Sequence, residues 1–176
     1  GLKKVLSIVL CVAMICSFVG TAHAADKTFV DVKSNAWYYD AVMDVVDRGL
    51  FNGVGDGTSF APDMSLSRSM FVTVLWRNEG SPEGAKNVFT DVTLSSWYGK
   101  GVAWANKAEI VMGIGNNQFG PDISVTREQM ATMLTRVYKK VAWPDYTIST
   151  DKSYPLDHSV AKKFADDSQI SSCAYE

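Results

Sequence analysis

Apolar residues recur at helical spacing in two short segments of the chain, and a glycine-rich stretch separates them. The first segment runs from about Trp37 to Arg48, and Gly49 follows it, as glycine often does at a helix end. The second segment begins after Ser67. The pattern therefore predicts a helix, a loop and a second helix. The apolar positions on the inner faces are Tyr38, Ala41, Val42, Val45 and Val46 in the first helix and Met70, Phe71, Val74 and Leu75 in the second.

The whole helix–loop–helix pattern occurs twice. The chain was aligned with itself at an offset of 60 residues, with one residue deleted in the second copy. Sixteen residues are then identical in the two copies and occur in the same order. So many identities with a single gap indicate a duplicated unit. The matched pairs are Phe29/Phe89, Asp31/Asp91, Val32/Val92, Trp37/Trp97, Tyr38/Tyr98, Val42/Val102, Gly53/Gly113, Gly55/Gly115, Phe60/Phe119, Pro62/Pro121, Asp63/Asp122, Ser65/Ser124, Arg68/Arg127, Thr73/Thr132, Leu75/Leu134 and Arg77/Arg136.

The second helix of the second copy has a clear start. Thr126 and Gln129 have the spacing of a capping box, which predicts that this helix begins at Arg127. Apolar residues at helical spacing then follow. They are Met130, Met133, Leu134 and Val137.

The N-terminus has the features of a secretory signal peptide. Two lysines precede an apolar run at 5–19, and the small residues Ala22 and Ala24 have the spacing of a cleavage site. The apolar run is shorter than the roughly 20 residues of a membrane-spanning helix. We therefore expect cleavage after Ala24, export, and no membrane attachment of the mature chain.

A third copy starts at Phe164-Ala-Asp166. The stretch before it is rich in Pro, Ser, Thr and Asp and is typical of a linker or extended connection. We therefore predict a signal peptide at 1–24, repeats at 25–86 and 87–141, a linker at 142–163 and an incomplete third repeat at 164–176. Because this third repeat is unfinished, we expect further sequence after it.

Composition and charge exclude several classes of protein. With 47% hydrophobic and 20% charged residues among 176, the chain is not an acidic or basic disordered tail. Lys and Arg number 17 against 19 Asp and Glu, which gives no general electrostatic case for nucleic-acid binding. Cleavage would remove two lysines and change the formal net charge from −2 to −4. Only one of the three cysteines, Cys173, would remain, so we expect no internal disulfide.

The sequence offers little for catalysis or for binding a cofactor or metal. Glycines 53–57 follow a predicted helix and lack a Gly-Lys-Ser/Thr motif, so we interpret them as a turn, not a phosphate loop. The one mature histidine, His158, lies in the predicted linker, outside both repeats. Asp31 and Asp91 occur once per repeat, which favours a structural role over a glycosidase carboxylate pair. We expect no enzyme, cofactor or metal in this region.

One arginine per repeat stands at the start of a helix, a position that the helix dipole does not favour for a cation. Arg68 follows Ser67, and Arg127 follows Thr126. One explanation is an anionic ligand held jointly by the guanidinium and the free backbone N–H groups. The other is an ion pair with a nearby carboxylate, such as Asp63 or Asp122. The residues alone leave both explanations open.

The tryptophans at the start of the first helix of each repeat, Trp37 and Trp97, also allow two interpretations. Aromatic residues at helix starts are most often part of the core. An exposed indole could instead stack on the flat apolar face of a sugar. Core packing is the more common case.

Several motifs, taken in their order along the chain, resemble the S-layer homology domain. They are Phe-x-Asp-Val with Trp-Tyr, Gly-x-Gly, Phe-x-Pro-Asp and Thr126-Arg-Glu-Gln129. The resemblance covers Phe29 to about Tyr138 and the start at Phe164. It implies a mainly α fold of tandem helix–loop–helix repeats forming a pseudo-threefold bundle. It also implies a non-covalent anchor that binds secondary cell-wall polysaccharide, often bearing a pyruvate ketal, at the cell surface of a bacterium.

The resemblance further implies which residues contact the glycan. Arg127 matches the arginine of the family's Thr-Arg-Ala-Glu-like motif, and Arg68 matches it in a motif with Ser69 in place of the acidic residue. Trp37 and Trp97 are expected near the binding groove. The remaining expected contacts are Ser67, Thr126, Gly55 and Gly115.

Three functions follow as hypotheses. The first is a wall anchor of a secreted surface or S-layer protein. The second is the anchoring region of a secreted polysaccharide- or wall-degrading enzyme whose catalytic domain lies beyond residue 176. In the third, the repeats mediate protein–protein assembly, and self-assembly could also involve downstream regions.

Overall fold

The computed structural model describes residues 28–153, 164–171 and 174. The predicted signal peptide lies outside these residues, as does the second half of the predicted linker with His158, and so does Cys173. The chain divides into two compact units, which are described separately below.

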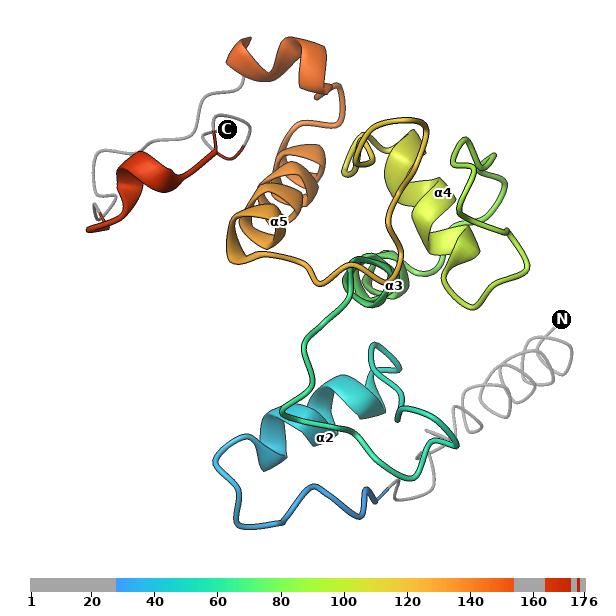
Figure 1. Cartoon of the computed structure of the whole chain (residues 1–176), viewed down its shortest axis with the longest axis vertical. Coiled ribbons are helices and arrows are strands. Elements are labelled where there is room, and N and C mark those ends of the chain that lie inside the picture. Colours follow the sequence, from blue (N-terminus) through green and yellow to red (C-terminus); the bar gives the residue numbers. More distant parts are fainter. Residues whose placement is uncertain (1–27, 154–163, 172–173, 175–176) are drawn as a thin grey trace, which may run out of the picture. The chain divides into compact units, whose positions relative to one another are not determined.

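The described residues form four α-helices and two short 3₁₀ helices (Figure 1). In this part of the chain, residues pair in β fashion only as isolated bridges, without an extended strand. The mainly α class is therefore confirmed, whereas the pseudo-threefold arrangement stays a prediction. The helices are α2 (Tyr39–Asp47), α3 (Arg68–Asn78), α4 (Gly99–Lys107), α5 (Arg127–Ala142), η1 (Ile148–Ser153) and η2 (Asp167–Gln169).

The first unit comprises described residues 28–48 and 52–60, with α2 as its helix. Helix α2 begins two residues later than predicted, because Trp37 and Tyr38 form a turn. Its buried residues are Val42 and Val46, which stand one helical turn apart, and Phe29 and Val32 are also buried in this unit. Gly49, with φ +69°, follows the helix end as predicted.

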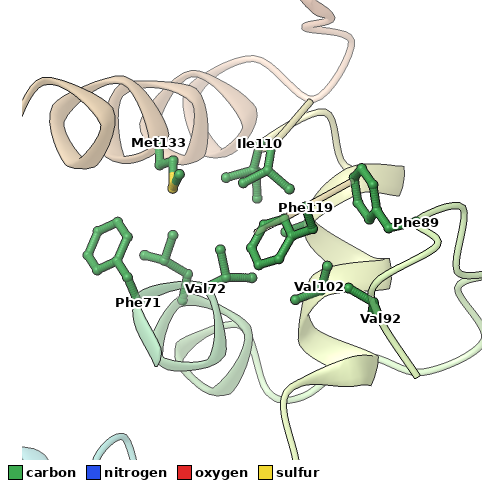
Figure 2. Packing of buried hydrophobic residues seen from close by; sticks show 11 residues of the cluster. Phe71, Val72, Phe89, Val92, Val102, Ile110, Phe119 and Met133 are labelled. Carbon is green, nitrogen blue, oxygen red and sulfur yellow. The ribbon is translucent and has the colours of Figure 1, made fainter. Parts of the chain in front are cut away.

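The second unit contains α3, α4 and α5 and a continuous apolar core (Figure 2). Helices α3 and α4 pack directly on each other, and Met133 of α5 reaches the same core. This core ties the second helix of the first repeat to both helices of the second repeat. Its members are Phe71, Val72, Leu75, Phe89, Val92, Val102, Ala105, Ile110, Val111, Phe119 and Met133.

The aspartate of each Phe-x-Asp-Val motif closes the loop of its own repeat. Asp31 accepts the backbone N–H of Phe60 at 2.8 Å, and Asp91 accepts those of Phe119 and Gly120, each at 2.8 Å. Burial favours the neutral form of Asp91, but these hydrogen bonds and the charge of Arg68 outweigh it and lower its pKa. The structural interpretation of both aspartates is confirmed.

A second hydrogen bond also occurs once in each repeat. Arg77 of α3 donates to the carbonyl oxygen of Leu50 at 2.9 Å, and Arg136 of α5 donates to that of Ile110 at 3.3 Å. Each arginine thus links the second helix of its repeat to the chain that leaves the first helix. The repeated contact is independent evidence for two copies of one fold.

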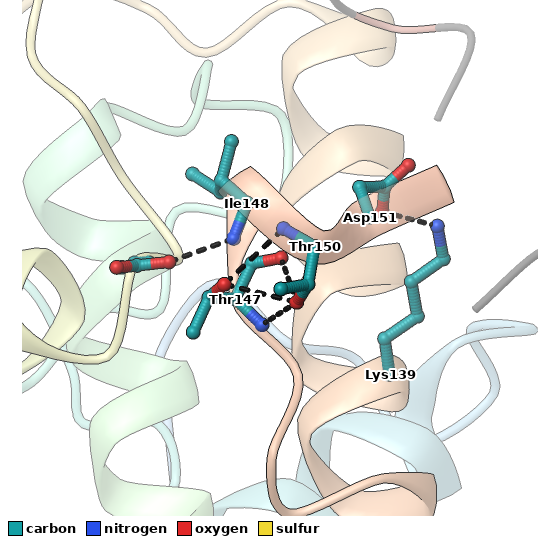
Figure 3. A network of polar contacts seen from close by, with 6 residues as sticks. Lys139, Thr147, Ile148, Thr150 and Asp151 are labelled. Atoms are coloured by element: carbon teal, nitrogen blue, oxygen red, sulfur yellow. Dashed lines mark hydrogen bonds and ion pairs between the residues drawn. The ribbon is translucent and has the colours of Figure 1, made fainter. Parts of the chain in front are cut away.

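The first half of the predicted linker folds onto α5. Tyr146 is fully buried, and the Nζ of Lys139, itself 1% exposed, lies 2.6 Å from Asp151 of η1 (Figure 3). The backbone N–H of Ile148 also donates to Glu109 at 2.7 Å. An aromatic ring and a paired carboxylate hold this segment in place despite its linker-like composition. The domain boundaries themselves stay predictions.

Candidate functional site at the helix N-termini

Arg68 is buried, with 4% of its surface exposed. Its Nε donates to the carbonyl oxygen of Phe119 at 3.0 Å and its Nη1 to Oε1 of Gln129 at 3.3 Å. Its guanidinium carbon lies 4.8 Å from the centre of the Phe119 ring. Burial lowers the pKa of Arg68, and the charge of Asp91 opposes this shift. The hydrogen-bonding partners belong to the second repeat. Among the described residues, Arg68 forms no ion pair with Asp63 or Asp122, which was one of the two explanations left open.

The N-terminus of α3 is satisfied by the chain itself. The backbone N–H groups of Arg68 and Ser69 donate to the carbonyl oxygens of Ile123 at 2.8 Å and Pro121 at 3.1 Å. Ser67 caps the helix by accepting the N–H of Met70 at 3.2 Å. The free donors expected at a helix start are therefore engaged by a loop of the second repeat.

Arg127 stands in a different environment. Thr126 accepts the N–H of Gln129 at 3.2 Å while the Gln129 side chain accepts the N–H of Thr126 at 3.4 Å, so the predicted capping box is confirmed. Glu128 accepts from the N–H and hydroxyl of Ser171, at 3.0 and 3.1 Å. Arg127 itself is exposed, and its side chain has no hydrogen-bond or ion-pair partner among the described residues.

Both tryptophans before the first helices lie at the surface. Trp37 is 94% exposed and Trp97 is 58% exposed, so the more common core interpretation is wrong for both. Each indole meets the following tyrosine edge to face, with ring centres 5.5 Å apart for Trp37–Tyr38 and 5.1 Å apart for Trp97–Tyr98. Each repeat thus presents one aromatic face to solvent, steadied by a tyrosine.

The predicted site glycines are turn residues in open surroundings. Gly55 has φ +58° and Gly115 φ +104°, and a Cβ added at either would meet no atom within 4 Å. The first glycine of each Gly-x-Gly motif is crowded instead. A Cβ added to Gly53 would lie 2.5 Å from the carbonyl oxygen of Gly57, and a Cβ added to Gly113 would lie 2.6 Å from the carbonyl oxygen of Gln118. The turn interpretation of these loops is confirmed.

Sequence reasoning missed the partners of Arg68, because Phe119 lies 51 residues away and Gln129 lies 61 away. The repeat alignment could have suggested Phe119, which stands in the Phe-x-Pro-Asp motif. Within the described residues, no three His, Cys, Asp or Glu side chains gather as a metal site would require. No helix in this part of the chain combines the length and apolar character needed to span a membrane.

These features define a class of protein built from tandem helix–loop–helix repeats. The same internal hydrogen bonds occur in each copy, and each copy has one arginine at a helix start and one exposed tryptophan. The family model of the S-layer homology domain matches residues 28–69 and 88–131, one match in each repeat. The chain belongs to the S-layer homology family.

Known relatives extend this finding. The chain is 31% identical over 150 residues to an S-layer protein of Bacillus licheniformis, covering 84% of this chain and 17% of that protein. It is 33% identical over 147 residues to an endoglucanase of Bacillus sp. (strain KSM-635), covering 78% and 15%. It is 31% identical over 154 residues to an amylopullulanase of Thermoanaerobacterium thermosulfurigenes, covering 87% and 8%. The chain thus spans less than a fifth of the length of these curated relatives.

The family defines the coarse role of this region. S-layer homology domains are non-catalytic modules that anchor secreted proteins at the bacterial cell surface by binding cell-wall polymers. The same module occurs in S-layer proteins and in polysaccharide-degrading enzymes.

Proposed function

We propose that this chain anchors a surface protein by binding a pyruvylated secondary cell-wall polysaccharide through the second repeat. The observation that carries the proposal is Arg127, an exposed guanidinium without a partner among the described residues, at the capped start of a long helix. An anionic group on the glycan would supply the partner that the chain itself does not.

The chemistry of a pyruvate ketal fits this position. Its carboxylate is small and planar, and it can accept two parallel hydrogen bonds from a guanidinium. The N-terminus of α5 adds a partial positive charge at the same end of the helix. A locally placed cation of this kind lets a protein of net negative charge bind an anionic polymer.

The exposed tryptophans support a sugar as the rest of the ligand. Trp97 belongs to the same repeat as Arg127, and Trp37 holds the matching place in the first repeat. An indole face in water gains from covering the apolar C–H face of a sugar ring. The open surroundings of Gly55 and Gly115 leave their backbone accessible to a glycan.

We assign different roles to the paired arginines. Arg68 and its cap Ser67 hold the two repeats together, because the guanidinium is buried and its hydrogen bonds go to the second repeat. Arg127 is left for the ligand, next to Thr126, whose side chain caps α5. The carboxylate therefore binds mainly at the second repeat.

Sedimentation with purified cell-wall sacculi tests the proposal. The mature chain should sediment with native sacculi and stay in solution with sacculi stripped of their secondary polymer. Arg127→Ala should weaken binding about tenfold, the effect of one charge-assisted hydrogen-bonded pair, and Lys107→Ala, an exposed charge on α4, should bind normally. Equal sedimentation with native and stripped sacculi would contradict the proposal.

The second candidate is the anchoring region of a secreted polysaccharide-degrading enzyme. The similarity to an endoglucanase and an amylopullulanase favours it, since anchor modules of this family occur in both. Assaying the whole protein for hydrolysis of β-glucan and starch decides between an enzyme anchor and an S-layer anchor. A protein inactive on polysaccharides would favour the S-layer alternative.

A further inference from the structure

The loop that follows α2 holds the single Asn-Gly pair among the 176 residues, Asn52-Gly53. In such a pair, the backbone nitrogen of the glycine can attack the side-chain amide carbon of the asparagine. The attack is fastest before glycine, because a residue without a Cβ leaves its nitrogen accessible and its backbone free to turn. The pair is therefore a candidate site of deamidation.

The side chain of Asn52 lies at the surface. In the second repeat the matching residue is Met112, which is 63% exposed although its neighbour Val111 lies in the core that α3, α4 and α5 share. This position is thus exposed even in the repeat whose core is covered by helices on both sides. Its exposure is a property of the repeat, so water reaches Asn52.

The attacking nitrogen of Gly53 is not held by a hydrogen bond. Its N–H has no acceptor among the described residues. The N–H groups that follow it are engaged, since Val54 donates to the carbonyl oxygen of Ser59 at 2.7 Å and Gly57 donates to that of Val54 at 2.9 Å. A bonded N–H must give up its acceptor before its nitrogen can react, and Gly53 has no such cost.

The same loop holds a second pair of this kind, Asp56-Gly57, in which both reacting groups are held. The N–H of Gly57 is bonded to Val54, as described above. The Oδ1 atom of Asp56 accepts the N–H of Thr58 at 3.0 Å and its hydroxyl at 2.7 Å. The loop therefore leaves Asn52-Gly53 able to react and restrains Asp56-Gly57.

We propose that Asn52 deamidates spontaneously through a succinimide. The nitrogen of Gly53 loses its proton to solvent and forms a bond with Cγ of Asn52, and the side-chain nitrogen leaves as ammonia. One water molecule then opens the ring. Opening at Cγ gives aspartate, whereas opening at the backbone carbonyl gives isoaspartate, in which the main chain runs through the side-chain carbons. This inference is independent of the proposed glycan site.

The isoaspartate product does not fit the loop. It lengthens the main chain by one carbon directly before Gly53, where an added Cβ would already lie 2.5 Å from the carbonyl oxygen of Gly57 and 2.8 Å from that of Ser59. The extra atom would displace the pairing of Val54 with Ser59. Deamidation would therefore weaken the first repeat, whereas the second has no Asn-Gly pair.

Peptide mapping of the mature chain, incubated at neutral and at mildly alkaline pH, tests the proposal. Trypsin cuts after Arg48 and Arg68, so one peptide contains both pairs. We expect this peptide to gain the mass of an acid in place of an amide at Asn52 and to separate into an aspartate and an isoaspartate form. The reaction should be faster at the higher pH, because the attacking nitrogen must lose a proton. A peptide that stays unmodified in the folded chain but converts in urea would overturn the proposal.

A matched variant tests whether the loop selects the site. Asp56→Asn creates a second Asn-Gly pair, and its side-chain oxygen can still accept from Thr58. In the folded chain, Asn52 should deamidate about tenfold faster than the new asparagine, the effect of a hydrogen bond that must first be broken. In urea the two rates should be alike. Equal rates in the folded chain would overturn the selection by the loop.

The second repeat allows the site to be transferred. The N–H of Gly113 also has no acceptor among the described residues, and Ile114 donates to the carbonyl oxygen of Gln118 at 2.8 Å, as Val54 does to Ser59. Met112→Asn should therefore deamidate in the folded chain at a rate similar to that of Asn52. A Met112→Asn chain that does not react there would show that this loop geometry is not sufficient.

The effect on the fold is measured after long incubation. The incubated wild type should unfold at a lower urea concentration than incubated Asn52→Ser, which cannot deamidate at this position, whereas the two fresh proteins should unfold alike. Equal unfolding of the two incubated proteins, once mapping shows that the wild type contains isoaspartate, would contradict the predicted effect on the loop.

Discussion

Helices α3 and α5 are copies of one element, and they begin with the same cap and the same arginine. In α3 the arginine is 4% exposed and bonded to the second repeat, whereas in α5 it is exposed and has no partner among the described residues. The motif is the same, but the surroundings decide what it does. The repeated arginine therefore has a structural role in α3, and in α5 it is the residue that we propose binds the glycan.

The largest expected difference is between the losses of stability caused by replacing the two arginines. Arg68→Ala should lower the free energy of unfolding by about 3 kcal/mol, because it removes buried packing and leaves the Phe119 carbonyl without its donor. Arg127→Ala should change it by less than about 0.5 kcal/mol, as for an exposed residue. Urea unfolding of both variants measures the difference. Equal losses would contradict the separate roles.

The C-terminal ends of α3 and α5 differ as well, because the segment that contains η1 packs on α5. Asp151→Asn should cost about 2 kcal/mol at neutral pH, because it leaves the buried ammonium of Lys139 without its carboxylate. Far-ultraviolet circular dichroism during urea unfolding measures this loss. Asp166→Asn, at an exposed aspartate, is the control.

The pH dependence of that loss follows from the pKa of Asp151. Burial raises this pKa, but hydrogen bonds from Lys139 and Tyr146 and the charges of Lys139 and Arg136 outweigh it, so the pKa is lowered. A lowered folded-state pKa contributes stability above the unfolded value of about 4 and loses it as the pH falls through the folded value. The wild type and Asp151→Asn should therefore converge in stability below about pH 4. A constant gap down to pH 2 would contradict this.

The loop-closing aspartates should show a smaller effect that is alike in the two repeats. Asp31 and Asp91 each accept a backbone N–H group across the loop of their own repeat, so Asp31→Ala and Asp91→Ala should each cost about 2 kcal/mol. Thermal unfolding of each variant measures the losses. A loss confined to one of the two variants would contradict a shared role.

The helix caps should show the smallest effect. Ser67→Ala and Thr126→Ala each remove an acceptor for one N–H group and should each cost about 1 kcal/mol. The two losses should be alike, because capping depends on the local turn and not on contacts with a neighbouring repeat. Chemical unfolding of the two variants measures the losses. A loss in only one variant would show that contacts with a neighbouring repeat alter the cap.

Local features of this fold could be predicted from the sequence, because they depend on residues close together in the chain. The capping box at Thr126 and Gln129 and the turn glycines are examples. The roles of Asp31 and Asp91 could be predicted because duplication made them recognisable. In each case a short motif has one dominant physical explanation.

The remaining features depend on contacts that spacing does not encode. Arg68 is buried by Phe119, 51 residues away, and no local pattern reports that contact. Aromatic residues at helix starts are most often part of the core, yet Trp37 is 94% exposed. The segment around Tyr146 has the composition of a linker, and one buried ring and one ion pair outweigh that composition.

Binding of wild type and Arg127→Ala to one polysaccharide, with and without its pyruvate ketals, tests the central claim most directly. Isothermal titration measures the four affinities, which form a double-variant cycle. We expect removal of the ketals to weaken wild-type binding about tenfold and to leave Arg127→Ala unchanged, because the guanidinium and the carboxylate act as one pair. An Arg127→Ala chain that still distinguishes the two polymers as strongly as the wild type would contradict the claim.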